Sequence, residues 1–400
     1  MYCLQKICNS YGDNSKTTNL QEGSMIKATA YAGTLLALSL ASIPATAQVQ
    51  DYEVITAPAM IAPEATSAVL TEITLAGDRQ IAVGDYGLVI SRDSADVEWQ
   101  QALVDTSVFL TAVDFADDLK GWAVGHHGVI MHTSDGGRTW QRQLDGFQYI
   151  ELQQLYFAAQ VERLTEALDN DELSEDERYE LELELETAEF QLENAEFAVQ
   201  EGPTKPFLDV LVLSEQVILV SGAYGSLLRS IDGGVTWNLL DAAVENPDNF
   251  HLNALEGGEE FTFLAGEAGQ LFRSNDQGTS WETLESPYYG SYFGLHIDAK
   301  DRLWVFGLRG NIFVSDDQGN SFRQIKLEDP VNINAAADAP NGGVYLVGNA
   351  GALAWVNAAG EIIETRHGSG AALTDLVINN DQSLTLVGQL GVLTLPAFAQ

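Results

Sequence analysis

The stretch Gly125–Trp140, GHHGVIMHTSDGGRTW, decides the fold because its pattern is not unique in the chain. A G-x-x-G quartet preceded by alternating apolar residues recurs seven times, with first glycines at Gly84, Gly125, Gly222, Gly266, Gly307, Gly348 and Gly388. Successive copies begin 40 to 44 residues apart, except for one interval of 97. An aromatic residue follows 15 positions after the first glycine in five copies, at Trp99, Trp140, Trp237, Trp281 and Phe322.

Each copy reads as four short strands that alternate apolar and polar residues and are separated by turns. The second turn repeats a Ser-x-Asp-x-Gly pattern, in which the Asp and Ser side chains can hydrogen-bond the amides of their own turn. Four-stranded units at a period of 40 to 45 residues are typical of a β-propeller. The sequence therefore predicts an all-β fold, a seven-bladed β-propeller over residues 48–400 with an inserted antiparallel α-helical hairpin.

Ring closure is expected to use the start of the mature chain. The last copy offers only three strands before the chain stops, and the segment DYEVIT at 51–56 is unassigned. We expect residues 51–56 to be the closing strand of blade seven, with Tyr52 in the place of the repeat's Trp. That pairing would remove the open edges of the sheet.

The long interval holds an insertion at about 148–203, between blades two and three. Two helix-like runs, at about 150–168 and 175–199, flank a polar turn, and Ser174 with Glu177 forms a capping-box pattern. Between Glu151 and Glu201 there are 17 acidic and two basic residues. The hairpin is either a solvated element whose charge keeps it soluble or a docking arm on a rigid scaffold.

The N-terminus reads as a processing signal. Residues 1–24 are interpreted as a misassigned extension, and residues 25–47 as a signal peptide that begins at Met25 and ends in Ala45-Thr46-Ala47 before Gln48. Both cysteines lie in the extension, so the mature chain would have none, as suits a bacterial periplasm. The net charge of −39 argues against nucleic acid as a partner. We expect a monomer without a membrane span in the mature chain.

The geometry of a propeller blade predicts a partner-binding face. The G-x-x-G turns and the connections between blades open on the same side, where the insertion also stands. Exposed aromatics with scattered Arg are typical of a protein-binding surface. The candidates on this face are Tyr86, His126, His127, Tyr224, Tyr288, Tyr289, Tyr292, Arg309, Arg366 and His367.

Catalytic and cofactor motifs are not found, and we expect neither an enzyme nor a bound cofactor or metal. Adjacent turn residues point different ways, so one metal ion cannot easily take both His126 and His127. The residues Asp135, Asp232, Asp276 and Asp317 recur once per blade, which indicates structural Asp-box turns. Such turns also occur in sialidases, so an Asp-box glycoside hydrolase is an alternative, as is a small-ligand-binding propeller.

With these turns, GWAVGHHGVIMHTSDGGRTW and PFLDVLVLSEQVILVSGAYG, the sequence resembles the photosystem II stability/assembly factor family, a photosynthesis-related group of BNR/Asp-box propellers. The resemblance implies an assembly factor that binds a membrane-protein client. Secreted bacterial members with a helical insertion are the most similar, and they accompany exporters of the resistance-nodulation-division class. The resemblance therefore implies a periplasmic scaffold or stability factor, or an accessory protein of an exporter complex.

Overall fold

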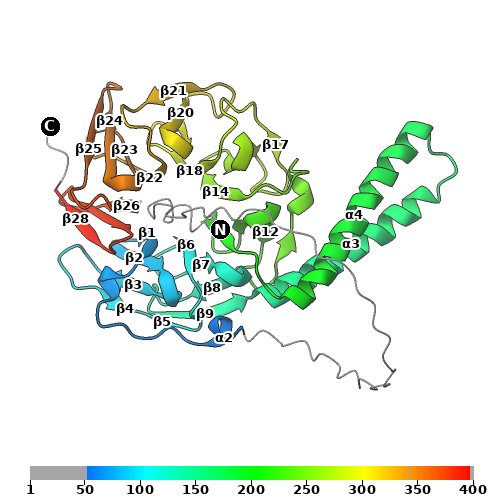
Figure 1. Ribbon diagram of the computed structural model, residues 1–400, viewed down its shortest axis with the longest axis horizontal. Coiled ribbons are helices and arrows are strands. Elements are labelled where there is room, and N and C mark those ends of the chain that lie inside the picture. The colour runs from blue at the N-terminus through cyan, green and yellow to red at the C-terminus, as the bar shows by residue number, and fades with distance from the viewer. Residues whose placement is uncertain (1–51, 341, 397–400) are drawn as a thin grey trace, which may run out of the picture.

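Seven antiparallel sheets form a ring in the computed structural model, which describes residues 52–340 and 342–396 (Figure 1). Each innermost strand contacts that of the next sheet, and the last contacts the first, so the ring is closed. These strands are β1 (Leu70–Ala76), β6 (Leu110–Phe115), β10 (Phe207–Val212), β14 (Leu252–Gly257), β18 (Tyr292–Ile297), β22 (Ile333–Asp338) and β26 (Leu373–Ile378). The predicted propeller is confirmed, and its sheets are numbered blades 1 to 7 in this order.

The other strands of each blade follow outward in chain order. Blade 1 continues with β2 (Arg79–Gly84), β3 (Val89–Arg92) and β4 (Gln100–Gln101), and blade 2 with β7 (Gly121–Gly125), β8 (Val129–Thr133) and β9 (Thr139–Leu144). Blade 3 has β11 (Ile218–Gly222), β12 (Leu227–Ser230) and β13 (Asn238–Leu239), and blade 4 has β15 (Thr262–Gly266), β16 (Leu271–Ser274) and β17 (Glu282–Thr283). Blade 5 has β19 (Leu303–Gly307), β20 (Asn311–Ser315) and β21 (Arg323–Lys326), and blade 6 has β23 (Gly343–Gly348), β24 (Ala352–Asn357) and β25 (Ile362–Arg366). Blade 7 has β27 (Leu384–Gly388) and β28 (Leu393–Leu395).

The core lies between neighbouring blades, because the alternating strands place apolar side chains on both faces of each sheet. Between blades 1 and 2, for example, Ile81 and Val83 meet Val113, Met131 and Trp140. The repeated aromatic position contributes most at Trp140, which is fully buried, and least at Ile363 of blade 6, which is exposed.

The Asp-box turns are held by their own hydrogen bonds, as their recurrence predicted. In blade 2, Asp135 accepts bonds from the amides of Arg138 and Thr139 at 3.0 and 2.9 Å and from the hydroxyls of Thr133 and Thr139. Asp232, Asp276 and Asp317 repeat this arrangement in blades 3, 4 and 5. Partial burial alone would raise the pKa of Asp276, but the bonds from Ser280, Ser274 and Thr279 lower it to about 2. These carboxylates are structural.

The expectation for residues 51–56 is wrong. Residues Glu53–Thr56 form a helical turn, α2, and among the described residues blade 7 has three strands. Ile55 is buried between blades 1 and 2 in the cluster that contains Trp140. The guanidinium of Arg142 donates a hydrogen bond to the carbonyl oxygen of Ile55 and so fixes its backbone. A short alternating segment cannot distinguish a strand from a single helical turn, and here burial of Ile55 decides between them.

Residues 52–69 instead form a strap around the outside of blades 2, 1 and 7 (Figure 1). The Ala59 amide donates to Val104 at 3.0 Å, and further along the strap Thr66 accepts a bond from the Val392 amide of blade 7 at 2.8 Å. Residues 103–104 pass from blade 1 to blade 2, since β5 (Leu103–Val104) pairs in parallel with β9 of blade 2. The strap thus spans the junction between the first and last blades.

Side chains on the innermost strands join the blades to one another. At five junctions a Thr or Asn donates to the carbonyl of the residue that begins the next inner strand, and these donors are Thr71, Thr111, Asn253, Asn334 and Thr374. At five junctions a carboxylate accepts from a backbone amide of the next inner strand, and these acceptors are Glu72, Asp114, Asp209, Glu256 and Asp375. The junction of blades 7 and 1 has both, so it is closed without a shared strand.

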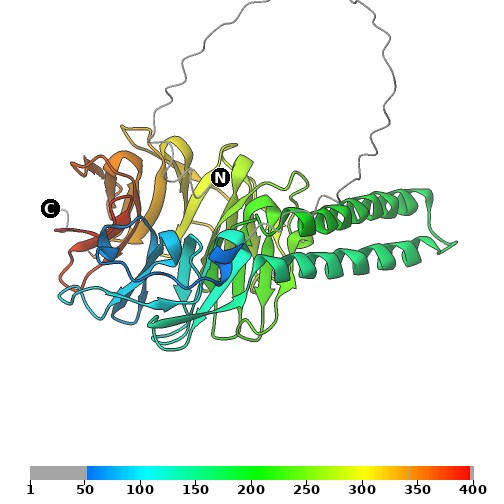
Figure 2. The same ribbon diagram turned by 60° about the horizontal axis from the view of Figure 1, so that its bottom comes forward.

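The insertion is a helical hairpin of α3 (Gly146–Leu168) and α4 (Glu175–Glu201), slightly longer at its base than the expected runs. The capping box of Ser174 and Glu177 is confirmed, and Asp145 with Gln148 forms a second one at the start of α3. The two helices run antiparallel and project well beyond the ring (Figure 2). On α3, Leu155 is exposed, whereas Phe157 is buried.

Candidate partner-binding face

The G-x-x-G turns hold their second central residue in the left-handed region. Tyr86, His127, Tyr224 and Arg309 have φ between 54° and 58° and are each followed by a glycine that also has positive φ. Two successive positive φ values give the turn that matches the twist of a β-hairpin. A non-glycine residue in this region costs roughly 1 kcal/mol or more. Tyr86, Tyr224 and Arg309 nevertheless present large exposed side chains there.

The two adjacent histidines have separate environments. The ring of His126 packs on Phe109 with centroids 5.1 Å apart, and burial lowers the pKa of His126 to about 4. Nδ1 of His127 lies 2.7 Å from the carbonyl oxygen of Pro203, at the base of the hairpin. His126 is therefore mostly buried, and His127 contacts the hairpin, so neither is the freely exposed turn residue that the sequence predicted.

The tyrosine-rich connection before blade 5 divides into inward and outward residues. Tyr292 belongs to β18 and is 0% exposed, and burial raises its pKa to about 12. Tyr288 packs on Tyr292 and on Phe313. Tyr289, by contrast, is 91% exposed. The placement of Tyr292 on the surface is thus wrong, because it opens the inner strand and its ring fills the core; only Tyr289 is freely available to a partner.

The basic candidates lie on two neighbouring blades, 5 and 6. Arg309 is exposed on the turn of blade 5. Arg366 forms an ion pair with Asp329 at 2.8 Å and donates to the carbonyl of Ala350. Nδ1 of His367 lies 2.7 Å from the hydroxyl of Ser369. These side chains do not gather into a basic patch.

The base of the hairpin is anchored on blade 3. Tyr149 of α3 is buried, its ring packs on Phe207, and its hydroxyl donates to Ser226 at 2.7 Å. The Tyr52 hydroxyl of the strap donates to the carbonyl of Glu201, at the end of α4. The hairpin is therefore fixed to both the ring and the strap at its root.

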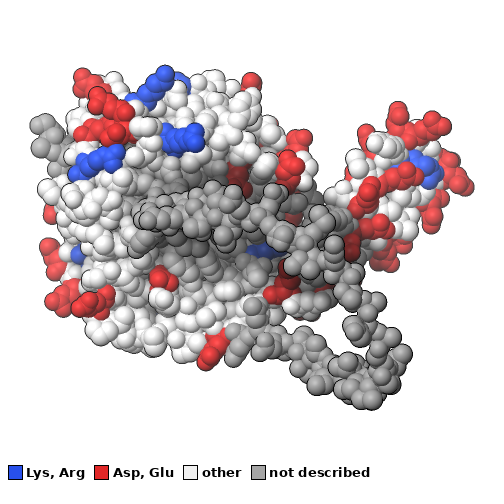
Figure 3. Space-filling model, in the orientation of Figure 1, with Lys and Arg blue, Asp and Glu red and all other residues white. Residues whose placement is uncertain are grey.

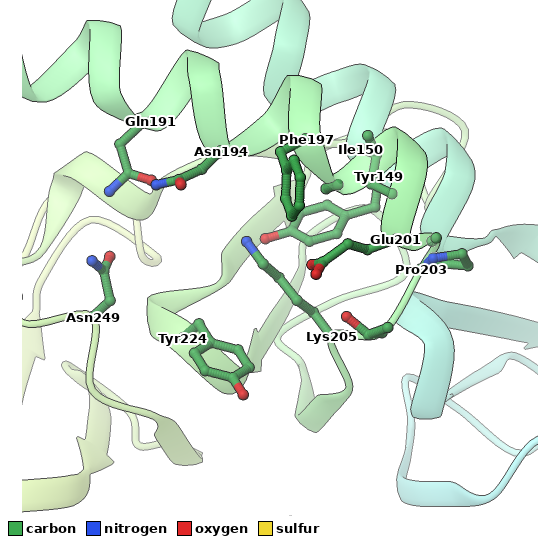
Figure 4. Close-up of a pocket in the computed structure, with 14 residues that line it drawn as sticks. Tyr149, Ile150, Gln191, Asn194, Phe197, Glu201, Pro203, Lys205, Tyr224 and Asn249 are labelled. Atoms are coloured by element: carbon green, nitrogen blue, oxygen red, sulfur yellow. The ribbon is translucent and has the colours of Figure 1, made fainter. Parts of the chain in front are cut away.

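A cavity of about 260 Å³ lies beside this anchor (Figure 4). Its walls include Asn194 and Phe197 of α4, Lys205 below the helix, and Tyr224 and Asn249 of the ring. Burial lowers the pKa of Lys205, and burial raises the pKa of the nearby Asp241 to about 6. Asp241 is the charge that partly offsets the cost of burying Lys205.

The central channel is acidic. A cavity of about 310 Å³ is lined by the five carboxylates that join the blades and by His296, whose Nε2 lies 3.2 Å from Asp338. Burial raises the pKa of Asp114 to about 6 and that of Glu256 to about 7. Of the described residues that line this cavity, none is an Arg.

Two other kinds of site are absent from the described ranges, a metal cluster and a membrane-spanning helix. Residues 52–340 and 342–396 contain no cluster of three His, Cys, Asp or Glu side chains placed to hold a metal ion. No helix in that part of the chain is both long and apolar enough to cross a membrane.

Comparison with known proteins supports the resemblance seen in the sequence. The family model described as photosynthesis system II assembly factor YCF48 matches residues 91–161 and 191–288, on either side of the hairpin tip. Over these residues the chain is similar to the photosystem II assembly factor family, and its fold is a β-propeller. No curated protein matched its sequence significantly.

Solved structures share the fold of this propeller. A structure of YCF48 bound to a D1 peptide has a TM-score of 0.56 at 15% identity and covers 84% of this chain and 95% of that one. YCF48 from Cyanidioschyzon merolae also has a TM-score of 0.56, at 14% identity, and covers 84% and 97%. The WD40 propeller domain of Doa1 has a TM-score of 0.54 at 9% identity and covers 86% and 97%. At these identities the likeness shows the fold alone.

Sequence reasoning missed the residues at the root of the hairpin. Tyr149 and Lys205 flank the insertion at its two ends, and neither belongs to a repeat. A long loop that is docked rather than freely hinged needs a large buried side chain near its root, and Tyr149 was the available signal. Lys205 could also have been singled out from the sequence, because basic residues are rare in this chain.

The raised pKa values in the channel predict a pH dependence of stability. A carboxyl group whose pKa is higher in the folded than in the unfolded state binds its proton more tightly when folded, so stability is lost as pH rises from about 4 to about 7. Because solvent reaches the channel, we expect the pair Asp114 and Glu256 to contribute on the order of 2 kcal/mol. Urea unfolding at pH 5 and pH 7.5 should show a smaller loss in Asp114→Asn/Glu256→Gln than in the wild type, because Asp241, whose pKa is also raised, is present in both proteins.

The double variant also removes a complication. His126 acts in the opposite sense, because its pKa is lowered and its stabilising neutral form is lost as pH falls from about 6.5 to about 4. His126 is present in both proteins, so the difference between them isolates the two carboxyl groups. Parallel pH profiles for wild type and variant would contradict the prediction.

Proposed function

We propose that this propeller is a non-catalytic scaffold or assembly factor that grips a membrane-protein client by its hairpin-bearing face. This face is the side of the ring that carries the G-x-x-G turns, the connections between blades and the hairpin. The observation that carries the proposal is an arm anchored rigidly at its root by Tyr149 yet projecting far from the ring (Figure 2). A rigid support lowers the entropy that an arm loses on binding.

The remaining exposed residues support the same face. Tyr86, Tyr224, Tyr289 and Arg309 display large side chains there, and two of the tyrosines occupy strained turn positions. The ring of Tyr224 also meets the ring of His251 edge-on at a centroid distance of 4.9 Å. The comparison with a YCF48 structure bound to a D1 peptide adds that a propeller of this fold can hold part of a membrane protein.

The charge of the hairpin indicates the charge of the surface that a client would present to it. On the face shown in Figure 3 the basic side chains stand apart from one another with acidic ones nearby, and acidic side chains dominate the hairpin. Opposite charges on a partner would speed association and set its orientation. We therefore propose a client with a basic docking surface, in the periplasm, and an exporter complex of the resistance-nodulation-division class is the partner that the sequence resemblance favours.

The proposal is tested by shortening the arm while keeping its root. Replacing residues 158–190 with a Gly-Ser linker leaves Tyr149 and the end of α4 in place, so the ring should stay folded. Crosslinking and pull-down from native membranes should recover the client with the full chain and at least about tenfold less with the short arm. Mass spectrometry of the same material should find the mature N-terminus at Gln48.

Three results would count against the proposal. Equal recovery of the same partners by both proteins would show that the arm does not dock the client. A cytoplasmic chain that starts at Met1 would refute the periplasmic location. A purified protein that hydrolyses a glycoside would refute the non-catalytic role.

A further inference from the structure

Helix α4 has a second apolar seam that faces away from α3. Its inward positions are Leu181, Leu185, Ala188, Leu192 and Ala195, all buried or half-buried. The second seam runs along Leu183, Thr187, Phe190, Asn194 and Phe197, with successive spacings of 4, 3, 4 and 3 residues. A position two residues away on a helix lies about 200° around its axis, so the two seams are on opposite sides. We call the second one the outer seam.

The outer seam is uncovered. Leu183, Phe190 and Phe197 are 54 to 58% exposed, although each is large and apolar. The hydroxyl of Thr187 already donates a hydrogen bond to the carbonyl of Leu183, so it does not need an acceptor on a partner protein. Spacings of three and four along a helix are those of a coiled-coil interface, and here the apolar Leu183, Phe190 and Phe197 are seven residues apart with a polar residue between each pair. The exposed apolar surface is therefore a row of three anchors on one side of the helix.

Glutamates border the seam. Taking Leu183, Phe190 and Phe197 as the d positions of a heptad, Glu186 and Glu193 fall at the g positions, which in coiled coils pair with charges on the facing helix. Acidic side chains cover the arm in Figure 3, and few basic ones lie among them. This agrees with the 17 acidic and two basic residues over 151–201. A second copy of this arm would place like charges opposite one another. The seam therefore selects against self-association.

The seam leads into the cavity at the hairpin's root. Asn194 and Phe197, its last two members, are also part of the cavity wall, and Tyr224 and Asn249 of the ring stand on the opposite side (Figure 4). Tyr224 is exposed and held at a φ of 58°. An occupant of the seam would thus meet the ring at one end, which fixes its position along α4.

We propose that the outer seam docks an amphipathic helix of a partner protein, with an apolar stripe toward α4, Lys or Arg on both flanks of that stripe, and one end in the cavity beside Tyr224. The inference rests on the proposed function and names the segment of the client that the arm holds. Helix-on-helix recognition of this kind uses apolar anchors for affinity and flanking charges for orientation. Phe190, in the middle of the seam, is the expected hot spot.

The test uses a synthetic helix and the mature chain from Gln48. The probe is a peptide of about four heptads with Leu at a and d and Lys at e and g, which repels itself and stays monomeric. Its affinity is measured by fluorescence anisotropy. We expect Phe190→Ala to raise Kd at least about tenfold. Leu155→Ala, on the outer side of α3 and 64% exposed, is the matched control and should change Kd less than about twofold.

Charge is tested separately. Glu186→Lys/Glu193→Lys should lower the affinity for the Lys-flanked peptide by about tenfold. The same variant should bind a peptide that carries Glu at those positions more tightly. Each of three results would overturn the inference: no binding of the Lys-flanked peptide, equal loss in Phe190→Ala and Leu155→Ala, or equal binding of both peptides. Equal losses of affinity in Phe190→Ala and Leu155→Ala would indicate that the peptide is attracted only by the net charge of the arm.

The seam and the proposed function can fail independently. If the shortened arm loses its client while Phe190→Ala in the full chain keeps it, the client docks on the arm by another surface, and only the seam is wrong. If the shortened arm keeps its client, the proposed role of the arm fails.

Discussion

Replacing Trp140 with alanine should lower the free energy of unfolding by about 3–5 kcal/mol, the range found for a buried Trp or Phe. Trp140 is 2% exposed, its ring meets Phe115 at a centroid distance of 5.8 Å, and its Nε1 donates to the carbonyl of Gly137 at 3.1 Å. The substitution leaves a cavity between blades 1 and 2, at the point where Ile55 of the strap also packs. Urea unfolding followed by circular dichroism measures the loss.

The same repeat position in blade 6 provides the control. Ile363 is 40% exposed, so Ile363→Ala should cost less than about 1 kcal/mol. The comparison separates burial from membership of the repeat, because both residues stand 15 positions after the first glycine of their copies. Similar losses in the two variants would show that the repeat position matters for a reason other than burial.

The repeat predicted the ring because its signals are local. Each G-x-x-G turn and each Asp box is satisfied within a few residues, as the bonds around Asp135 show. The strands and turns of such a unit can therefore be predicted from its own sequence. The capping box of Ser174 and Glu177 was found for the same reason.

The closure of the ring and the root of the arm depend on distant contacts. Ile55 packs with a tryptophan more than 80 positions away in the chain, and Tyr149 bonds a serine of the following blade. The size of Tyr149 is a local sign of burial, but the sequence around Ile55 or Tyr149 does not show which distant residue each one contacts. The outward placement of Tyr292 failed similarly, because its position at the start of an inner strand shows only in the register with β19.

Breaking the side-chain bonds between blades 7 and 1 should open the ring. The Thr374 hydroxyl donates to the carbonyl of Leu70 at 3.0 Å, and Asp375 accepts from the amide of Ile73 at 2.9 Å. We expect Thr374→Val/Asp375→Ala to lower the free energy of unfolding by about 3 kcal/mol, since it removes one bond and leaves a buried amide without its acceptor. Hydrogen exchange at the Ile73 amide should accelerate by more than the global loss of stability explains.

The junction of blades 2 and 3 is the matched control, because Thr111 and Asp114 make the same two kinds of bond there. Thr111→Val/Asp114→Ala removes comparable bonds, but the continuous chain through the hairpin still ties these blades together. Blades 7 and 1 meet only through non-covalent contacts, among them the strap at Thr66. A local opening at blades 7 and 1 therefore releases more conformational entropy, and we expect its inner strands to exchange faster than those of the control. If the two variants exchange alike, the strap and not the inner strands closes the ring.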